Sequence, residues 1–111
     1  MKIVIKLTIQ LILITITCVD VHAQEKETIR LTNGEWAPYM SETLDHFGYI
    51  SRIVKEAFSV EGIKVKFGFY PWKRAYSLAE NGMWDGSIVW GKRDDRAKAF
   101  YFSDPVVRVK Y

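Results

Sequence analysis

The stretch Trp84–Val106, WDGSIVWGKRDDRAKAFYFSDPV, contains the pattern on which the rest of the chain depends. Its apolar run Ser87–Trp90 predicts a buried strand, and Gly91 after the run permits a positive φ or a close backbone approach. The charged residues that follow predict a helical turn with Asp94 or Asp95 as its N-terminal cap. The stretch therefore predicts a strand that leads into a charged loop.

Arg96 lies beside the predicted helical turn, where a guanidinium and free backbone N–H groups both favour an anion. A guanidinium also offers a planar fork of donors to a carboxylate. We therefore expect Arg96 to bind a carboxylate, and the alternative is an arginine exposed in a solvated turn.

The residues before this stretch alternate between strand and helix patterns. Apolar and polar residues alternate at 28–32 and 63–69, which predicts two strands. Apolar residues spaced three and four apart predict a helix from Gly48 to Glu61 with Gly62 as its C-terminal cap. A second helix is expected at 71–81, with the proline as its first residue. The order strand, helix, strand, helix, strand is typical of an α/β fold with a parallel sheet.

Aromatic residues follow each of the three predicted strands. They are Trp36 and Tyr39 after the first strand, Tyr70 and Trp72 after the second, and Trp90 after the third. Ligands of parallel sheets bind beyond the carboxyl ends of the strands, so we expect these rings to converge with Arg96. Aromatic walls and one arginine suit a small zwitterion, or a carboxylate with an apolar or cationic body.

The first 23 residues have the pattern of a secretory signal. Lys2 and Lys6 precede the apolar run 7–19, and Val21–Ala23 places small residues where a signal peptidase reads them. The apolar run is too short to span a bilayer comfortably. We therefore expect a signal peptide at residues 1–23 and export to the periplasm.

Cysteine use and charge narrow the class of protein further. The single cysteine, Cys18, lies within the expected signal, so residues 24–111 contain none, which fits a bacterial periplasm better than a disulfide-stapled secreted domain. Lipid anchoring at Cys18 is not expected, because the preceding residues 15–17 are a poor lipoprotein box. The formal net charge is +3 and the basic residues are scattered, which argues against a nucleic-acid partner.

Catalysis finds little support in the sequence. His46 is the only histidine after the expected signal, and no acid pair or Ser/His/Asp grouping lies near the expected site. A metal site formed by His46 with Asp45 and Glu42 is conceivable but not expected. We therefore expect a binding protein that has no enzymatic activity and needs no cofactor or metal.

Four motifs occur in a fixed order along the chain. They are the loop Asn33–Tyr39 (NGEWAPY), the pair Gly48–Tyr49, the element Gly82–Asp85 (GMWD), and Arg96 followed six residues later by Phe102–Pro105 (FSDP). Together they resemble the bacterial extracellular solute-binding proteins of family 3, the periplasmic amino-acid-binding proteins of the type II periplasmic-binding fold.

This resemblance implies a fold and a role. Residues 24–111 would form the N-terminal lobe only, an incomplete three-layer α/β unit with a parallel sheet, truncated before the second lobe. The protein would capture an amino acid or a similar small carboxylate-bearing solute for the membrane component of an ABC-type transporter. The alternatives are a ligand-sensing module of a signalling or peptidoglycan-acting protein, and a truncated product that binds nothing.

The resemblance also implies roles for single residues. By motif position, Arg96 matches the arginine that clamps the α-carboxylate, Trp36 the aromatic that stacks on the ligand, and Asn33 a position that can touch the ligand's side chain. Arg93 stands where the family usually has a threonine, which leaves the choice of ligand open. The full expected ligand-binding set is Arg96, Trp36, Trp90, Asn33, Trp72 and Tyr39.

Overall fold

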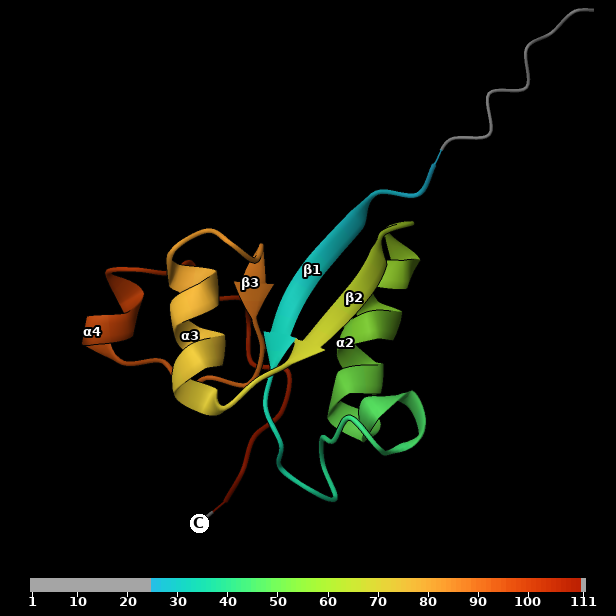
Figure 1. Ribbon diagram of the computed structural model, residues 1–111, viewed down its shortest axis with the longest axis horizontal. Coiled ribbons are helices and arrows are strands. Elements are labelled where there is room, and N and C mark those ends of the chain that lie inside the picture. The colour runs from blue at the N-terminus through green and yellow to red at the C-terminus, as the bar shows by residue number, and fades with distance from the viewer. Residues whose placement is uncertain (1–24, 111) are drawn as a thin grey trace, which may run out of the picture.

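The computed structural model describes residues 25–110 of the chain (Figure 1). The expected signal peptide at 1–23, with its cleavage site and Cys18, lies outside the described residues. The elements are β1 (Thr28–Asn33), the 3-10 helix η1 (Asp45–Phe47), α2 (Tyr49–Val60), β2 (Lys64–Phe69), α3 (Trp72–Glu80), β3 (Gly86–Ser87) and α4 (Asp94–Ala97). None of the helices in this part of the chain is long and apolar enough to cross a membrane.

The three strands form one parallel sheet in the order β2-β1-β3. β1 pairs with β2 along its whole length, so that Asn33 at its end lies opposite Phe69. On its other side β1 pairs with the short β3, where Thr32 lies opposite Ser87. The predicted alternation of strands and helices and the parallel sheet are confirmed.

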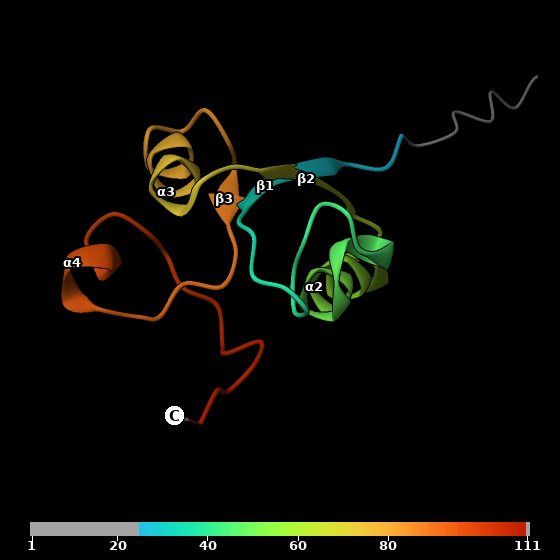
Figure 2. The same ribbon diagram turned by 60° about the horizontal axis from the view of Figure 1, so that its bottom comes forward.

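α2 and α3 lie on opposite faces of this sheet (Figure 2). The chain crosses from β1 to β2 in one direction along the sheet and from β2 to β3 in the other, and right-handed crossovers in opposite directions place their helices on opposite faces. Gly62 follows α2 with a φ of +73°, which confirms its predicted role in ending that helix. The protein is therefore a small compact α/β domain.

The core lies where β1 meets both helices. Its buried apolar members are Leu31, Met40, Ile50, Val54, Val65 and Ile88. Two polar side chains at the end of β1 join it to the helices. Thr32 Oγ1 donates to the carbonyl oxygen of Ala75 in α3 at 2.8 Å, and Asn33 Nδ2 donates to Ser51 Oγ in α2 at 2.9 Å. Because successive strand residues point to opposite faces, each helix receives one of these bonds.

The third strand is shorter than the sequence predicts. The apolar run predicts strand up to Trp90, whereas β3 ends at Ser87. Ile88 N still donates to the carbonyl oxygen of Thr32 at 3.1 Å, but Val89 has a φ of +66°, which an extended strand does not allow. Trp90 therefore belongs to the loop beyond the sheet.

The helix starts also differ from the predictions. Arg93 occupies the N-cap position of α4, while Asp94 and Asp95 lie in its first turn and do not cap it. Asp95 instead accepts two hydrogen bonds from the Arg93 guanidinium, at 3.1 and 3.0 Å. Pro71, with a ψ of 140°, is the N-cap of α3 and not its first helical residue. Gly91 has no positive φ, so its backbone does not require a glycine.

Candidate functional site

The carboxyl ends of the strands bring three of the expected residues together. Arg96 of α4 places its Cζ atom 5.1 Å from the centroid of the Trp90 ring. The Trp90 ring in turn meets the ring of Trp72, at the start of α3, with centroids 5.5 Å apart and planes at 89°. The expected convergence of Arg96, Trp90 and Trp72 at this edge is thus present in the structure.

Hydrogen bonds hold Arg96 and Trp90 in place. Arg96 Nη1 donates to the carbonyl oxygen of Gly91 at 2.9 Å, and Trp90 Nε1 donates to Ser87 Oγ at 2.7 Å. The first bond closes the loop that carries Arg96, and the second ties the indole to the end of β3. The guanidinium therefore rests on a ring that is itself fixed to the sheet.

Arg96 also lacks an acidic partner among residues 25–110. The ion pairs in this range are Arg30 with Asp85, Arg52 with Glu56, and Arg93 with Asp95. The hydrogen bonds and charge of Arg93 lower the pKa of Asp95 below its ordinary value, so this carboxylate stays charged and paired with Arg93. Arg93 thus keeps the neighbouring Asp95 carboxylate occupied, and the half-buried Arg96 has no ion-pair partner within residues 25–110.

A second group of aromatic residues lies on the loop after β1. Trp36 and Tyr39 have ring centroids 4.8 Å apart, and Tyr39 meets Tyr49 at 5.5 Å. Backbone hydrogen bonds between Trp36 and Met40, at 2.8 and 2.9 Å, close this loop. No ring contact within residues 25–110 joins this group to Trp90, and Tyr70 packs instead against Trp84 at 5.7 Å, so the expected aromatic residues form three groups and not one.

Asn33 has a structural position. Its side chain is fully buried, with 0% of the residue exposed. Its Nδ2 donates to Ser51 Oγ, and its Oδ1 accepts a hydrogen bond from Gly34 N at 2.9 Å. Both polar atoms of the side chain are occupied within the protein, so the expected contact of Asn33 with a ligand is not supported by this arrangement.

Sequence reasoning missed two residues that support Trp90. Tyr76 of α3 packs its ring against Trp90 at 5.2 Å, and Phe100 packs against Tyr76 at 5.1 Å. Tyr76 lies four residues after Trp72, a spacing that places two side chains on one helix face, so the sequence did contain a signal for it.

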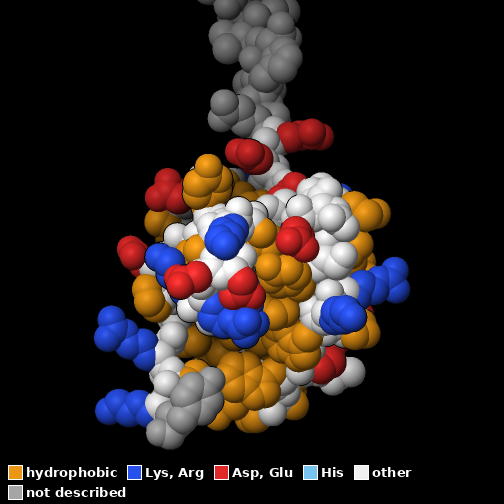
Figure 3. Space-filling model, turned by 90° about the vertical axis from the view of Figure 1, so that its left-hand side faces the viewer, with side chains coloured by type: hydrophobic (Ala, Val, Ile, Leu, Met, Phe, Trp, Pro, Cys, Tyr) orange, Lys and Arg blue, Asp and Glu red, His pale blue; other side chains and the backbone are white. Residues whose placement is uncertain are grey.

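On the face that carries α3 and α4, hydrophobic side chains are exposed between charged ones (Figure 3).

Gly34 directly follows the last residue of β1. A Cβ atom at this position would lie 2.5 Å from Cε2 of Trp72, which is closer than two carbons can approach. The absence of a side chain at Gly34 therefore lets the Trp72 indole lie against the end of β1.

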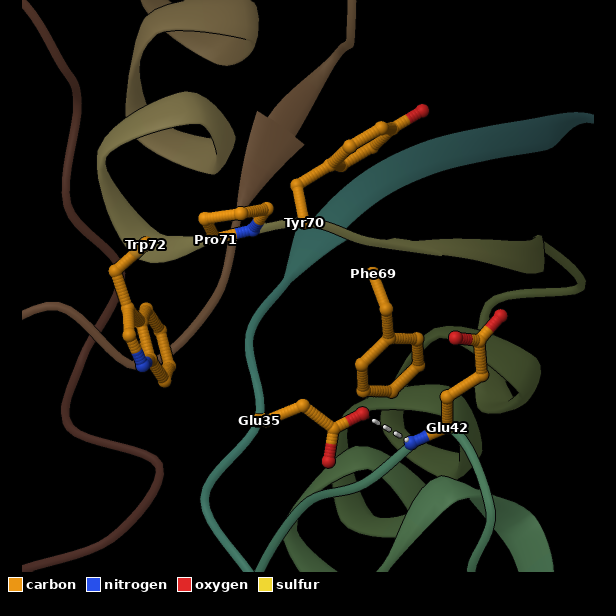
Figure 4. A pocket seen from close by; sticks show the side chains of 6 residues that line it. All are labelled: Glu35, Glu42, Phe69, Tyr70, Pro71 and Trp72. Carbon is orange, nitrogen blue, oxygen red and sulfur yellow. Dashed lines mark hydrogen bonds between the residues drawn. The ribbon is translucent and has the colours of Figure 1, made fainter.

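A hollow of about 300 Å³ lies beside Trp72. Its lining residues are Glu35, Glu42, Phe69, Tyr70, Pro71 and Trp72 (Figure 4). Glu35 lies between Trp72 and Phe69 in this view, while the Tyr70 ring points away from both carboxylates. The sequence placed Glu42 in a possible metal group, yet among residues 25–110 no group of three or more His, Cys, Asp or Glu side chains could hold a metal ion.

Hydrogen bonds fix the Glu35 carboxylate. The backbone N–H of Glu42 donates to Glu35 Oε1 at 2.9 Å. This bond, followed by one from the Ser41 side chain, lowers the pKa of the Glu35 carboxyl below its ordinary value. Glu35 is therefore ionised at neutral pH, and the hollow carries negative charge.

Comparisons of this chain with protein-family models, with curated proteins and with solved structures found no match. Support for a function therefore comes from the resemblance of the four motifs and from the geometry at the strand ends.

Proposed function

We propose that the chain is the ligand-capturing lobe of a periplasmic solute-binding protein, which takes up an amino acid or a similar small carboxylate-bearing solute for an ABC-type transporter. The observation that carries this proposal is the Arg96 guanidinium, which rests on the Trp90 ring at 5.1 Å. The finer fold assignment, a first lobe of the type II periplasmic-binding fold, belongs to the same proposal. It is supported by the β2-β1-β3 order and by the site at the carboxyl ends of the strands.

The chemistry of Arg96 favours a carboxylate. A guanidinium carries several N–H donors in one plane, and the Gly91 carbonyl accepts from only one nitrogen, Nη1. The remaining donors can hold both oxygens of a carboxylate, which makes the pair stronger and more directional than a single charged contact. Contact with the Trp90 ring limits the positions that the guanidinium can take, so less side-chain freedom is lost on binding.

The aromatic residues supply walls for the rest of the solute. Trp90 contacts Arg96 and Trp72 meets Trp90, while Trp36 stays the proposed stacking ring because of its motif position. Tyr39, with 37% of the residue exposed, lies beside Trp36 and is accessible to a ligand. We propose binding and not catalysis, since no paired acid and base and no nucleophile with a neighbouring base lies beside Arg96 in the described part of the chain.

A thermal-shift screen tests this function. The full chain is heated with amino acids, betaines and small carboxylates, and a compound that binds the folded state raises its melting temperature. Arg96→Ala is screened in parallel with Lys98→Ala, which removes a neighbouring exposed positive charge. We expect a stabilising carboxylate compound whose effect is lost in Arg96→Ala and kept in Lys98→Ala. An equal response of both variants would contradict the proposal.

A further inference from the structure

The hollow beside Trp72 is open to solvent on one side and large enough for a small group. Its volume of about 300 Å³ is at the lower end of the range for ligand pockets, roughly 300 to 1,000 Å³, which suits a small solute better than a peptide. Phe69 and Trp72 supply aromatic surface. Both rings pack against a further ring, Phe69 against Phe47 at 5.6 Å and Trp72 against Trp90 at 5.5 Å. The walls are therefore largely formed before a ligand arrives.

The charge of the hollow selects the kind of ligand. Two carboxylates, Glu35 and Glu42, line it, and no Lys or Arg does. Neither carboxylate takes part in an ion pair within residues 25–110, and the Glu42 carboxylate accepts no hydrogen bond there either. Aromatic faces attract cations through the negative charge of their π-systems, and carboxylates attract them directly. Both kinds of lining thus favour an ammonium group.

Trp72 connects this hollow to Arg96. The indole lines the hollow and also meets Trp90, whose ring carries the guanidinium. The two charged places are separated by two ring contacts, of 5.5 Å between the tryptophans and 5.1 Å between Trp90 and Arg96. An α-amino acid has its ammonium and carboxylate on one carbon, so it matches this separation poorly.

We propose that the hollow binds the terminal ammonium group of a solute whose carboxylate lies at Arg96, with several carbons between the two charges. This inference rests on the proposed function, because it takes Arg96 as the carboxylate site. It goes further by assigning Glu35, Glu42, Phe69 and Trp72 to a cation subsite and by naming ω-amino carboxylates as the ligand class.

Two isomers test the spacing between the two charges at constant composition and net charge. 6-Aminohexanoate and norleucine have the same atoms and the same charges, and differ only in where the ammonium is attached. Calorimetric titration of the full chain with each isomer gives the dissociation constants. We expect 6-aminohexanoate to bind several-fold more tightly than norleucine.

Substitutions of the two carboxylates test whether the ammonium group of the ligand lies in the hollow. Glu35→Gln keeps an oxygen that can accept the Glu42 N–H, and Glu42→Gln changes a carboxylate that has no hydrogen-bond partner among the described residues, so both are expected to fold. Each substitution should weaken 6-aminohexanoate about two- to fivefold, the usual effect of an exposed ion pair, and leave norleucine unchanged. Glu80→Gln, at the opposite end of α3 from Trp72, is the control and should alter neither isomer.

Each outcome decides the inference. If the isomers bind equally, or if Glu35→Gln and Glu42→Gln leave 6-aminohexanoate unaffected, the cation subsite is wrong. A loss of both isomers in Arg96→Ala would in that case still support the proposed function. If neither isomer binds the unaltered chain, the inference is overturned, and the proposed function then depends on the broader compound screen. A loss of both isomers in Glu42→Gln would also overturn it, because a cation subsite affects only the isomer that reaches it.

Discussion

Asn33 at the end of β1 donates a hydrogen bond from Nδ2 to Ser51 Oγ in α2, at 2.9 Å and with both residues fully buried. Asn33 also accepts from Gly34 N through Oδ1, and its own carbonyl oxygen accepts from Tyr70 N at 3.0 Å. One residue therefore joins the ends of β1 and β2 to the helix that covers them. The position of Asn33 therefore fixes where the loop after β1 and the connection after β2 begin.

Ser51→Ala should destabilise the fold. The substitution leaves the Asn33 amide without its buried acceptor, and an unsatisfied buried polar group lowers the free energy of unfolding by about 1–3 kcal/mol. Urea unfolding of the full chain measures this loss. Ser59→Ala, an exposed position on the same helix, is the matched control, and equal effects of the two substitutions would contradict the role given to the Asn33–Ser51 pair.

Gly34→Ala should displace the Trp72 indole. The new Cβ would lie 2.5 Å from Trp72 Cε2, so the ring has to move, at a typical overpacking cost of about 1–3 kcal/mol. We expect lower stability in urea unfolding together with an altered tryptophan fluorescence spectrum. Gly91→Ala is the control, because a Cβ there would meet its nearest atom, Arg96 Nη1, at an ordinary 3.8 Å. An unchanged spectrum in Gly34→Ala would show that the ring does not lie against β1.

Asp85→Asn should change the acid dependence of stability. The backbone N–H of Arg30 donates to Asp85 Oδ2 at 2.7 Å, and this bond, with the Arg30 side chain, lowers the pKa of Asp85 from 3.8. A carboxyl whose pKa is lower in the folded state stabilises the fold above its unfolded pKa, and the stabilisation is lost as the pH falls through the folded pKa.

The contribution of Asp85 is therefore present in full once the pH is well above the ordinary value of 3.8, and it is lost progressively as the pH falls from there through the lower folded pKa. Melting temperatures of the unaltered chain and of Asp85→Asn, measured from pH 7 to pH 2, should differ at neutral pH and converge in acid. Curves that stay parallel over the whole range would exclude the ionised Asp85 as the cause.

Residue spacing predicted the regular elements well, for a physical reason. The helix at Tyr49–Val60 and the strand at Lys64–Phe69 each bury one face, and burial of one face imposes a period on the sequence. The end of the third strand could not be predicted from such a period. Its apolar run continues to Trp90, but the positive φ of Val89 ends the extended backbone, and spacing carries no information about that angle.

The rule that ligands bind at the carboxyl ends of parallel strands predicted that Arg96, Trp90 and Trp72 meet, and the structure brings these three together. Arg96 and Trp90 lie six residues apart, and their contact follows from the turn between them. The hollow, in contrast, combines Glu35 and Glu42 from the loop after β1 with Phe69 and Trp72 from the end of β2 and the start of α3. Such a grouping depends on the register of β1 against β2, which puts Asn33 opposite Phe69 and which the sequence alone does not specify.

A cycle of four calorimetric titrations tests most directly whether Arg96 binds the carboxylate. A carboxylate compound found in the screen and the matching carboxamide are each titrated into the unaltered chain and into Arg96→Ala. Because the guanidinium pairs with the charged oxygens, replacing the carboxylate by the amide should weaken binding to the unaltered chain by about tenfold or more and hardly change binding to Arg96→Ala. The same loss in both proteins would show that the carboxylate binds elsewhere and would contradict the proposed site.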